Sequence, residues 1–186
     1  MSLSSQEAAK SLSQAEEAGR KSSELFFYRR SSPHLIMWGT IWVLGYGGTG
    51  LFPHQSNWIW GPLILLGIAG GAVMGRCYRT KDNTFGPRAW RIAALGAIVI
   101  FFVSATYAIM HPHLSAQLCA FPALITGTAY MCVGLWSGIR YVVAGAGVVA
   151  LTLIGFFTID PQLYFFWMAA VGGGSMILAG LWFRTV

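Results

Sequence analysis

Four side chains able to bind a metal or a proton lie in the short turns between apolar stretches: His54, His111, His113 and Asp160. Three imidazoles and a carboxylate form a ligand set that suits Zn²⁺ or Cu²⁺. Imidazole also changes its charge near pH 6.5, so the same set would respond to acidification. The alternative is that each side chain is solvated or caps a helix end. These four residues are therefore candidates for a metal site or a pH sensor, and no metal is assigned.

The rest of the chain offers little chemistry. Its apolar stretches hold none of the Asp, Glu, Lys, Arg or His side chains that usually carry ion coupling or catalysis in a membrane. No phosphate-binding loop, nucleophile elbow or zinc-protease motif occurs. We therefore predict no catalytic residue and no cofactor, although a bound lipid is compatible with the glycine-lined apolar faces.

The composition indicates a membrane protein. Of the 186 residues, 55% are hydrophobic and only 10% are charged, whereas soluble domains carry about a quarter charged residues. A helix needs about 20 apolar residues to cross a bilayer. Six stretches meet that length, at about 35–52, 58–75, 92–110, 115–138, 141–159 and 164–183. We predict an all-α polytopic fold with six transmembrane helices in residues 34–186.

The basic residues orient these spans. All 12 Lys and Arg fall on one side of a six-span topology: Lys10, Arg20, Lys21, Arg29, Arg30, Arg76, Arg79, Lys81, Arg88, Arg91, Arg140 and Arg184. By the positive-inside rule both termini are cytoplasmic, and we expect a multi-pass protein of the bacterial inner membrane. The net charge of +6 then reflects orientation and attraction to anionic membrane lipids rather than nucleic-acid binding.

Residues 1–33 are expected to form a polar cytoplasmic helix. Small or apolar residues recur in it at spacings of three and four, at Ala8, Leu12, Ala15, Gly19, Ser22 and Phe26. This seam would dock on a partner or a second copy, or else the segment is a solvated tail. Rings followed by two guanidinium groups suggest an anchor at the membrane interface, formed by Phe26, Phe27, Tyr28, Arg29 and Arg30.

The apolar region also contains an internal repeat. A proline lies after each odd-numbered span, at Pro53, Pro112 and Pro161, where a helix must end. The following spans share an opening pattern that ends in glycine, in residues 62–67, 122–127 and 167–172. Gly-Leu-Trp recurs at 134–136 and 180–182, with Arg140 and Arg184 soon after. We interpret this as three helical hairpins, while chance similarity among glycine-rich helices is the alternative.

This repeat resembles the short-repeat membrane proteins of the HdeD-like acid-resistance group, most clearly from Trp38 and Gly39 through Pro53 to Gly67 and Gly71. The resemblance covers the six spans and not residues 1–33. It implies three helical hairpins in a bacterial inner membrane, a role linked to acid stress, and no catalytic motif.

Glycines at helical spacing mark faces where helices can approach each other. The candidates for helix packing are Gly67, Gly71, Gly75, Gly134, Gly138, Gly173 and Gly174. Lipid provides no hydrophobic drive between helices, so close packing at such faces must supply the association energy. The contacts could be intramolecular or could form an oligomer seam.

Two functions are compatible with these features. The first is a non-catalytic accessory, scaffold or stress-response subunit that acts through helix contacts with itself or with another membrane protein. The second is a small channel or facilitator for small solutes, gated by external pH through the outer histidines.

Overall fold

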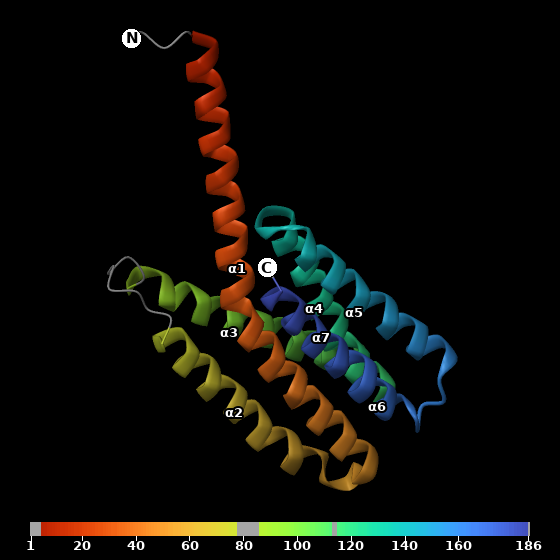
Figure 1. The fold of residues 1–186 in the computed structure, drawn as a ribbon. Helices are drawn as coiled ribbons and strands as arrows, with labels where there is room; N and C mark the ends of the chain where they lie inside the picture. Colours follow the sequence, from red (N-terminus) through yellow and green to blue (C-terminus); the bar gives the residue numbers. More distant parts are fainter. Residues whose placement is uncertain (1–4, 78–85, 113–114, 186) are drawn as a thin grey trace.

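The computed structural model describes residues 5–77, 86–112 and 115–185, and every element in that part of the chain is a helix (Figure 1). The elements are α1 (Ser5–Leu51), η1 (Pro53–Gln55), α2 (Ser56–Cys77), α3 (Gly86–Met110), α4 (Ser115–Ser137), α5 (Ile139–Thr158), α6 (Tyr164–Trp167), η2 (Met168–Gly173) and α7 (Gly174–Arg184).

Four helical segments among the described residues are long and apolar enough to cross a membrane: Pro53–Arg76, Ala116–Ser137, Ile139–Thr158 and Tyr164–Arg184. Ala97–Met110 of α3 is a shorter apolar helix. At the end of α1, glycine, threonine and tyrosine residues interrupt the aliphatic run and lower its mean hydropathy. The described part of the protein is thus all-helical, with four helices able to span a membrane.

Helix α1 unites two parts of the chain that the sequence suggested were separate. It runs 47 residues without a break at residue 33, which is about 70 Å of helix. Pro33 lies inside it and removes one backbone hydrogen bond. The helix continues because its packing there is tight: Ser32 and Leu35 are 0% and 2% exposed. The N-terminal half projects beyond the bundle (Figure 1).

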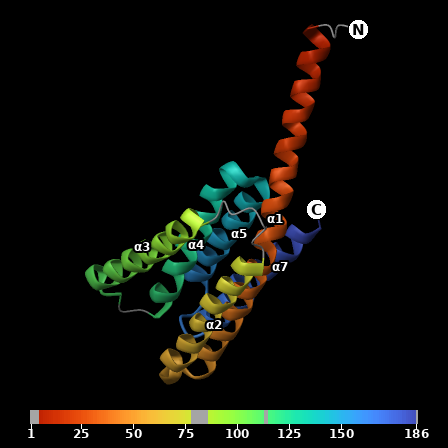
Figure 2. The same ribbon diagram turned by 90° about the vertical axis from the view of Figure 1, so that its left-hand side faces the viewer.

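The most extensive helix contacts join α1 to α7 and α4 to α5. Helix α2 packs mainly on α1, and only 6% of its apolar window is buried, against 33% for the last span. Helix α3 lies at the periphery (Figure 2). The core therefore consists of α1, α4, α5 and the final helical segment.

Two reciprocal glycine pairs lie in these two main contacts. A Cβ on Gly39 of α1 would lie 2.7 Å from the Gly173 carbonyl oxygen, and a Cβ on Gly173 would lie 2.8 Å from the Gly39 carbonyl oxygen. In the same way, a Cβ on Gly127 of α4 would lie 2.9 Å from the Gly145 carbonyl oxygen of α5, and one on Gly145 would overlap the Gly127 carbonyl oxygen. At each pair the two backbones touch directly, which any side chain would prevent.

The seven glycines proposed from sequence for packing fall into two groups. Added Cβ atoms would meet another helix at Gly67, Gly71, Gly134, Gly138 and Gly173. At Gly75 and Gly174, by contrast, a Cβ would have open space around it. Spacing alone missed Gly39, Gly127 and Gly145, because none of these forms a glycine pair four residues apart.

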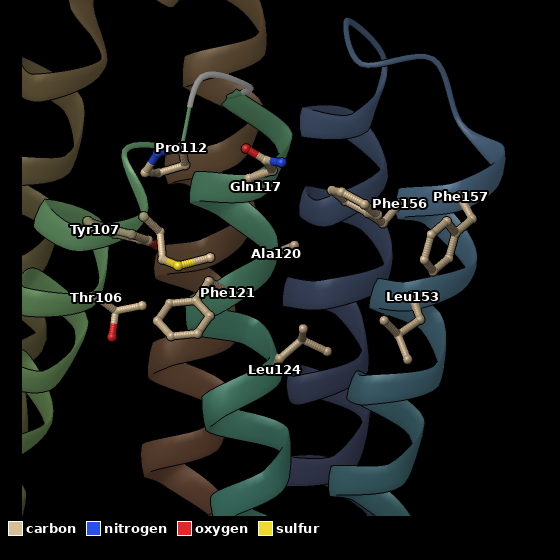
Figure 3. A pocket seen from close by; sticks show the side chains of 11 residues that line it. Thr106, Tyr107, Pro112, Gln117, Ala120, Phe121, Leu124, Leu153, Phe156 and Phe157 are labelled. Atoms are coloured by element: carbon tan, nitrogen blue, oxygen red, sulfur yellow. The ribbon is translucent and has the colours of Figure 1, made fainter.

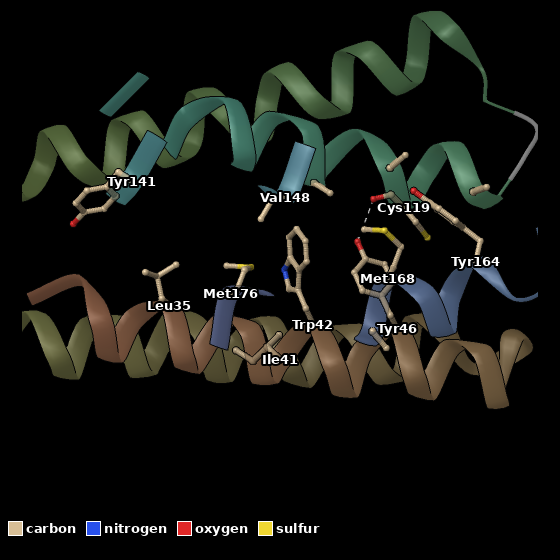
Figure 4. Close-up of a cluster of buried hydrophobic side chains, with 14 of the residues drawn as sticks. Leu35, Ile41, Trp42, Tyr46, Cys119, Tyr141, Val148, Tyr164, Met168 and Met176 are labelled. Atoms are coloured by element: carbon tan, nitrogen blue, oxygen red, sulfur yellow. Dashed lines mark hydrogen bonds between the residues drawn. The ribbon is translucent and has the colours of Figure 1, made fainter. Parts of the chain in front are cut away.

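Large side chains fill the space between the main helix pairs (Figure 4). Trp42 and Tyr46 of α1 face Cys119 of α4, Val148 of α5 and Met168 of η2, and all five are under 10% exposed. The Tyr46 hydroxyl donates to the Cys119 carbonyl oxygen at 3.2 Å. This bond ties α1 to α4 within an apolar core, where an unpaired hydroxyl would be costly.

Helix α3 is held to α4 by a hydrogen bond to a carbonyl group that Pro122 leaves without its usual helical donor. Pro122 has no N–H, so the Leu118 carbonyl, four residues earlier in α4, lacks its usual helix donor. The Tyr107 hydroxyl of α3 donates to this oxygen at 2.7 Å. A mid-helix proline in α4 thereby creates the attachment point for its neighbour.

Replacing Gly145 by leucine tests the close backbone contact. Gly145→Leu must push the Gly127 carbonyl and the Met131 backbone away, which we expect to cost about 1–3 kcal/mol. The expected result is a lower unfolding midpoint in detergent, measured by tryptophan fluorescence. Gly147→Leu is the matched control, since a Cβ there has nothing within 4 Å. Equal midpoints for the two variants would show that the contact does not matter.

Candidate functional site

The projecting part of α1, residues 5–27, is here called the arm. Nearly all its described side chains are exposed, including the seam residues Leu12 and Phe26 at 63% and 54%. Ion pairs between side chains four residues apart join Lys21 to Glu17 at 2.7 Å and Arg20 to Glu24 at 2.9 Å. Exposed pairs of this kind contribute little to helix stability.

The base of the arm meets the ends of α4, α5 and α7 in a cluster that we call the arm joint: Phe27, Tyr28, Ser31, Ser32, Gly138, Arg140, Tyr141, Gly180, Trp182, Phe183, Arg184 and Thr185. Figure 1 shows the end of α7 and the turn between α4 and α5 beside the middle of α1. Segments more than 100 residues apart in the chain therefore come together at this point.

Ser32 connects α1 to α7. Its hydroxyl donates to the Gly180 carbonyl oxygen at 2.6 Å and accepts the Nε–H of Arg184 at 2.9 Å. Ser32 is 0% exposed, so both bonds are shielded from water. Gly180 permits the approach, because a Cβ there would lie 3.0 Å from the Ser32 carbonyl oxygen.

Two tyrosine rings connect α1 to α5. Tyr28 stacks on Tyr141 with ring centroids 5.5 Å apart, and both pack against Phe183. The Tyr141 hydroxyl donates to the Phe27 carbonyl oxygen at 3.1 Å and also contacts the Ser31 hydroxyl. Gly138 has a φ of 126°, in the region that favours glycine, and a side chain there would overlap the Tyr28 hydroxyl.

Arg140 connects α5 to the end of α7. Its guanidinium donates to the Trp182 carbonyl oxygen at 2.7 Å and to the Thr185 hydroxyl at 3.3 Å. It also lies over the Trp182 ring, 4.7 Å from the centroid. A cation is favourable here, because the last carbonyl groups of a helix carry partial negative charge.

The five residues predicted to anchor the chain at the membrane interface differ in exposure, and Tyr28 is the one that is buried. Phe26 and Phe27 are 54% and 46% exposed, as rings at a membrane surface would be, whereas Tyr28 is 4% exposed and belongs to the arm joint. Arg29 is exposed and the Arg30 guanidinium lies 6.0 Å from the Phe26 ring centroid. The sequence signal that marked the rest of the joint was the repeated Gly-Leu-Trp followed by arginine, although it did not indicate that Arg140 would contact Trp182.

The turn residues proposed as metal ligands do not form a metal site in the described part of the chain, where no group of three or more His, Cys, Asp or Glu side chains is placed to hold an ion. His54 is exposed in η1, and His111 is exposed with a φ of 42° after α3. The Asp160 carboxylate accepts the Gln162 backbone N–H at 2.9 Å, which is a local turn role. His113 lies outside the described residues.

A lateral pocket of about 330 Å³ opens between the end of α3, α4 and α5 (Figure 3). Aromatic and aliphatic side chains such as Phe121, Leu124, Leu153 and Phe156 line it, with polar groups near Tyr107 and Gln117. Its lining suits an apolar chain, because apolar surfaces with few polar groups bind apolar ligands. Nothing in this lining resembles a nucleophile paired with a base.

Comparison of the chain with protein-family models, with curated proteins and with solved structures finds no match. Function is therefore inferred from the geometry of the arm and the arm joint.

Removing one hydroxyl tests the arm joint. Ser32→Ala removes the hydrogen bonds of the Ser32 hydroxyl to the Gly180 carbonyl and to the Arg184 Nε–H. The expected net loss is about 0.5–1.5 kcal/mol per bond, because the Gly180 carbonyl remains within helix α7 and the exposed Arg184 can bind water. We expect faster amide hydrogen exchange at the base of the arm and a lower unfolding midpoint. Ser13→Ala is the control, since Ser13 bonds only to the Lys10 carbonyl on the exposed arm. Unchanged exchange in Ser32→Ala would mean that the arm is held by other contacts.

The contact of His34 with α2 leads us to expect that the stability of the folded chain depends on pH. Its Nε2 accepts the Trp38 Nε1–H at 3.1 Å and its ring packs over Gly71. The residue remains solvent-exposed, but partial burial of the ring in this contact lowers the pKa of His34 below its usual 6.5. The unfolded chain then takes up a proton more readily than the folded one, so stability is full above pH 6.5 and falls as the pH drops below it. The measurement is the unfolding midpoint from pH 8 to pH 5. His34→Gln, which cannot titrate, should flatten this dependence, and an equally steep profile would assign it to another group.

Proposed function

We propose that this protein is a non-catalytic membrane scaffold or accessory subunit that presents a rigid helical arm to a partner. The observation that carries the proposal is the continuity of α1, whose 47 residues include both the exposed arm and a segment packed in the bundle core. Hydrogen bonds from the Ser32 and Tyr141 hydroxyls, and from the Arg140 backbone N–H to the Tyr28 hydroxyl, fix the base of this helix. A polar helix held at one end and exposed along its length is suited to binding rather than to catalysis.

We further propose that the chain crosses the bacterial inner membrane six times, as three hairpins, with both termini in the cytoplasm. The four apolar helices support this topology, as does the position of every Lys and Arg on one side of it. The arm would then extend into the cytoplasm. Its partner would be a second copy or another membrane protein, reached through the seam of small and apolar residues.

The packing of the bundle favours the scaffold over a small channel or facilitator. The side chains of Tyr164, Met168 and Phe183 lie between the helices and are at most 1% exposed. They fill space that a solute path would need. The absence of flux of water, protons or small neutral solutes through liposomes that contain the protein would agree with this choice, and measurable flux would reverse it.

A charge placed on the arm seam tests the scaffold proposal. Leu12→Glu puts a carboxylate on the seam, whereas Gln14→Glu puts the same charge on the same helix turn but on a face directed away from the seam. We expect native mass spectrometry after mild extraction to show a complex for the natural chain and for Gln14→Glu, and its loss for Leu12→Glu. The unfolding midpoint of the bundle should be equal in all three, because the arm is exposed there. A lone monomer in every case would refute the proposal.

A further inference from the structure

Two arginines of the arm joint have guanidinium groups held by hydrogen bonds at the end of α7. The Arg140 guanidinium donates to Trp182 and to Thr185, the residue that follows Arg184. The Nε–H of Arg184 donates to Ser32. Both positive charges therefore belong to the arm joint and are attached to defined partners.

Their hydrogen bonds are all to uncharged oxygen atoms. Within the described residues the ion pairs are those of the arm, between Lys21 and Glu17 and between Arg20 and Glu24. No described carboxylate lies within ion-pair distance of Arg140 or Arg184. An anion that contacts both guanidinium groups would be attracted by two positive charges.

The spare donors suit a phosphate group. A guanidinium has five N–H donors in a fork that matches phosphate oxygens, and Arg184 directs only its Nε–H to Ser32 in the described structure. The N-terminus of α5 begins at Ile139, next to Arg140, and its partial positive charge favours an anion at the same place.

The surroundings indicate that the phosphate belongs to a lipid. Apolar side chains flank the two arginines and are exposed: Trp136 at 83%, Ile139 at 70%, Leu181 at 47% and Trp182 at 39%. Exposed tryptophans and aliphatic side chains around a basic site are typical of the membrane interface, where rings lie at headgroup level and aliphatic groups contact acyl chains. A soluble phosphate would gain nothing from this apolar surface.

We propose that Arg140 and Arg184 bind the headgroup phosphate of an anionic phospholipid in the cytoplasmic leaflet, and that this lipid stabilises the arm joint. The proposal rests on the proposed topology, which puts the joint at that membrane surface. Because Arg184 bonds to Ser32 and Arg140 lies over Tyr28, 5.7 Å from its ring centroid, neutralising the two charges holds the base of the arm in its bonded geometry.

The test compares lipids and variants by native mass spectrometry of the full chain. Phosphatidylglycerol should be retained more strongly than phosphatidylcholine, by about fivefold for each arginine involved. Arg184→Gln and Arg140→Gln should each remove about that factor. Arg76→Gln is the control, because Arg76 is an exposed arginine in the last turn of α2, outside the joint. The same lipid should raise the unfolding midpoint of the natural chain and protect the base of the arm from hydrogen exchange.

Three results would overturn the proposal. Equal retention of both lipids would mean that no anionic site exists, or that the chain itself supplies the anion. An equal loss in Arg76→Gln would indicate diffuse surface charge. Displacement of the lipid by millimolar inorganic phosphate would assign the site to a soluble anion. None of these depends on the arm seam, so Leu12→Glu, which tests the scaffold, should retain phosphatidylglycerol as the natural chain does.

Discussion

Direct backbone contact at two glycine pairs is the constraint on which the rest of the structure depends. In lipid the attraction between helices comes from packing and hydrogen bonds, since acyl chains are as apolar as leucine. Where Gly39 meets Gly173 and Gly127 meets Gly145, two helices approach until a carbonyl oxygen occupies the position of the missing side chain. These contacts set the registers of α1 against the last helix and of α4 against α5. The buried tyrosines and tryptophans then fill the space between the two pairs.

The arm joint follows from those registers. Ser32 lies two turns before Gly39 on α1, and Gly180 lies two turns after Gly173, so the glycine contact brings the Ser32 hydroxyl to the Gly180 carbonyl. The turn between α4 and α5 supplies Arg140 and Tyr141 at the same level. A helix that would otherwise be free at its polar end is thereby attached to α5 and α7. This attachment makes the arm a fixed part of the molecule.

The sequence predicted the helical class and the approximate positions of the apolar helices, because hydrophobicity and length determine both. It also pointed to glycines as contact residues. It could not select Gly39 and Gly145, whose partners lie far along the chain, because a spacing rule describes one helix at a time. Tyr28 shows the same limit: aromatic residues near arginines are usual at a membrane surface, and only the tertiary contact with Tyr141 makes this ring buried. Residues on both sides of Pro33 belong to one helix, because packing around Pro33 outweighs the loss of one hydrogen bond.

Because α1 is one continuous helix, the arm would tilt as a rigid rod about the arm joint. The 23 residues of the arm span about 35 Å, so a tilt of about 10° at the base would move the tip by about 6 Å, more than half a helix diameter. A small rearrangement among α1, α5 and α7 would thus become a displacement large enough for a bound protein to detect. The rigidity of the arm joint, rather than the residues at the tip of the arm, would then determine how completely a structural change in the bundle reaches the proposed partner.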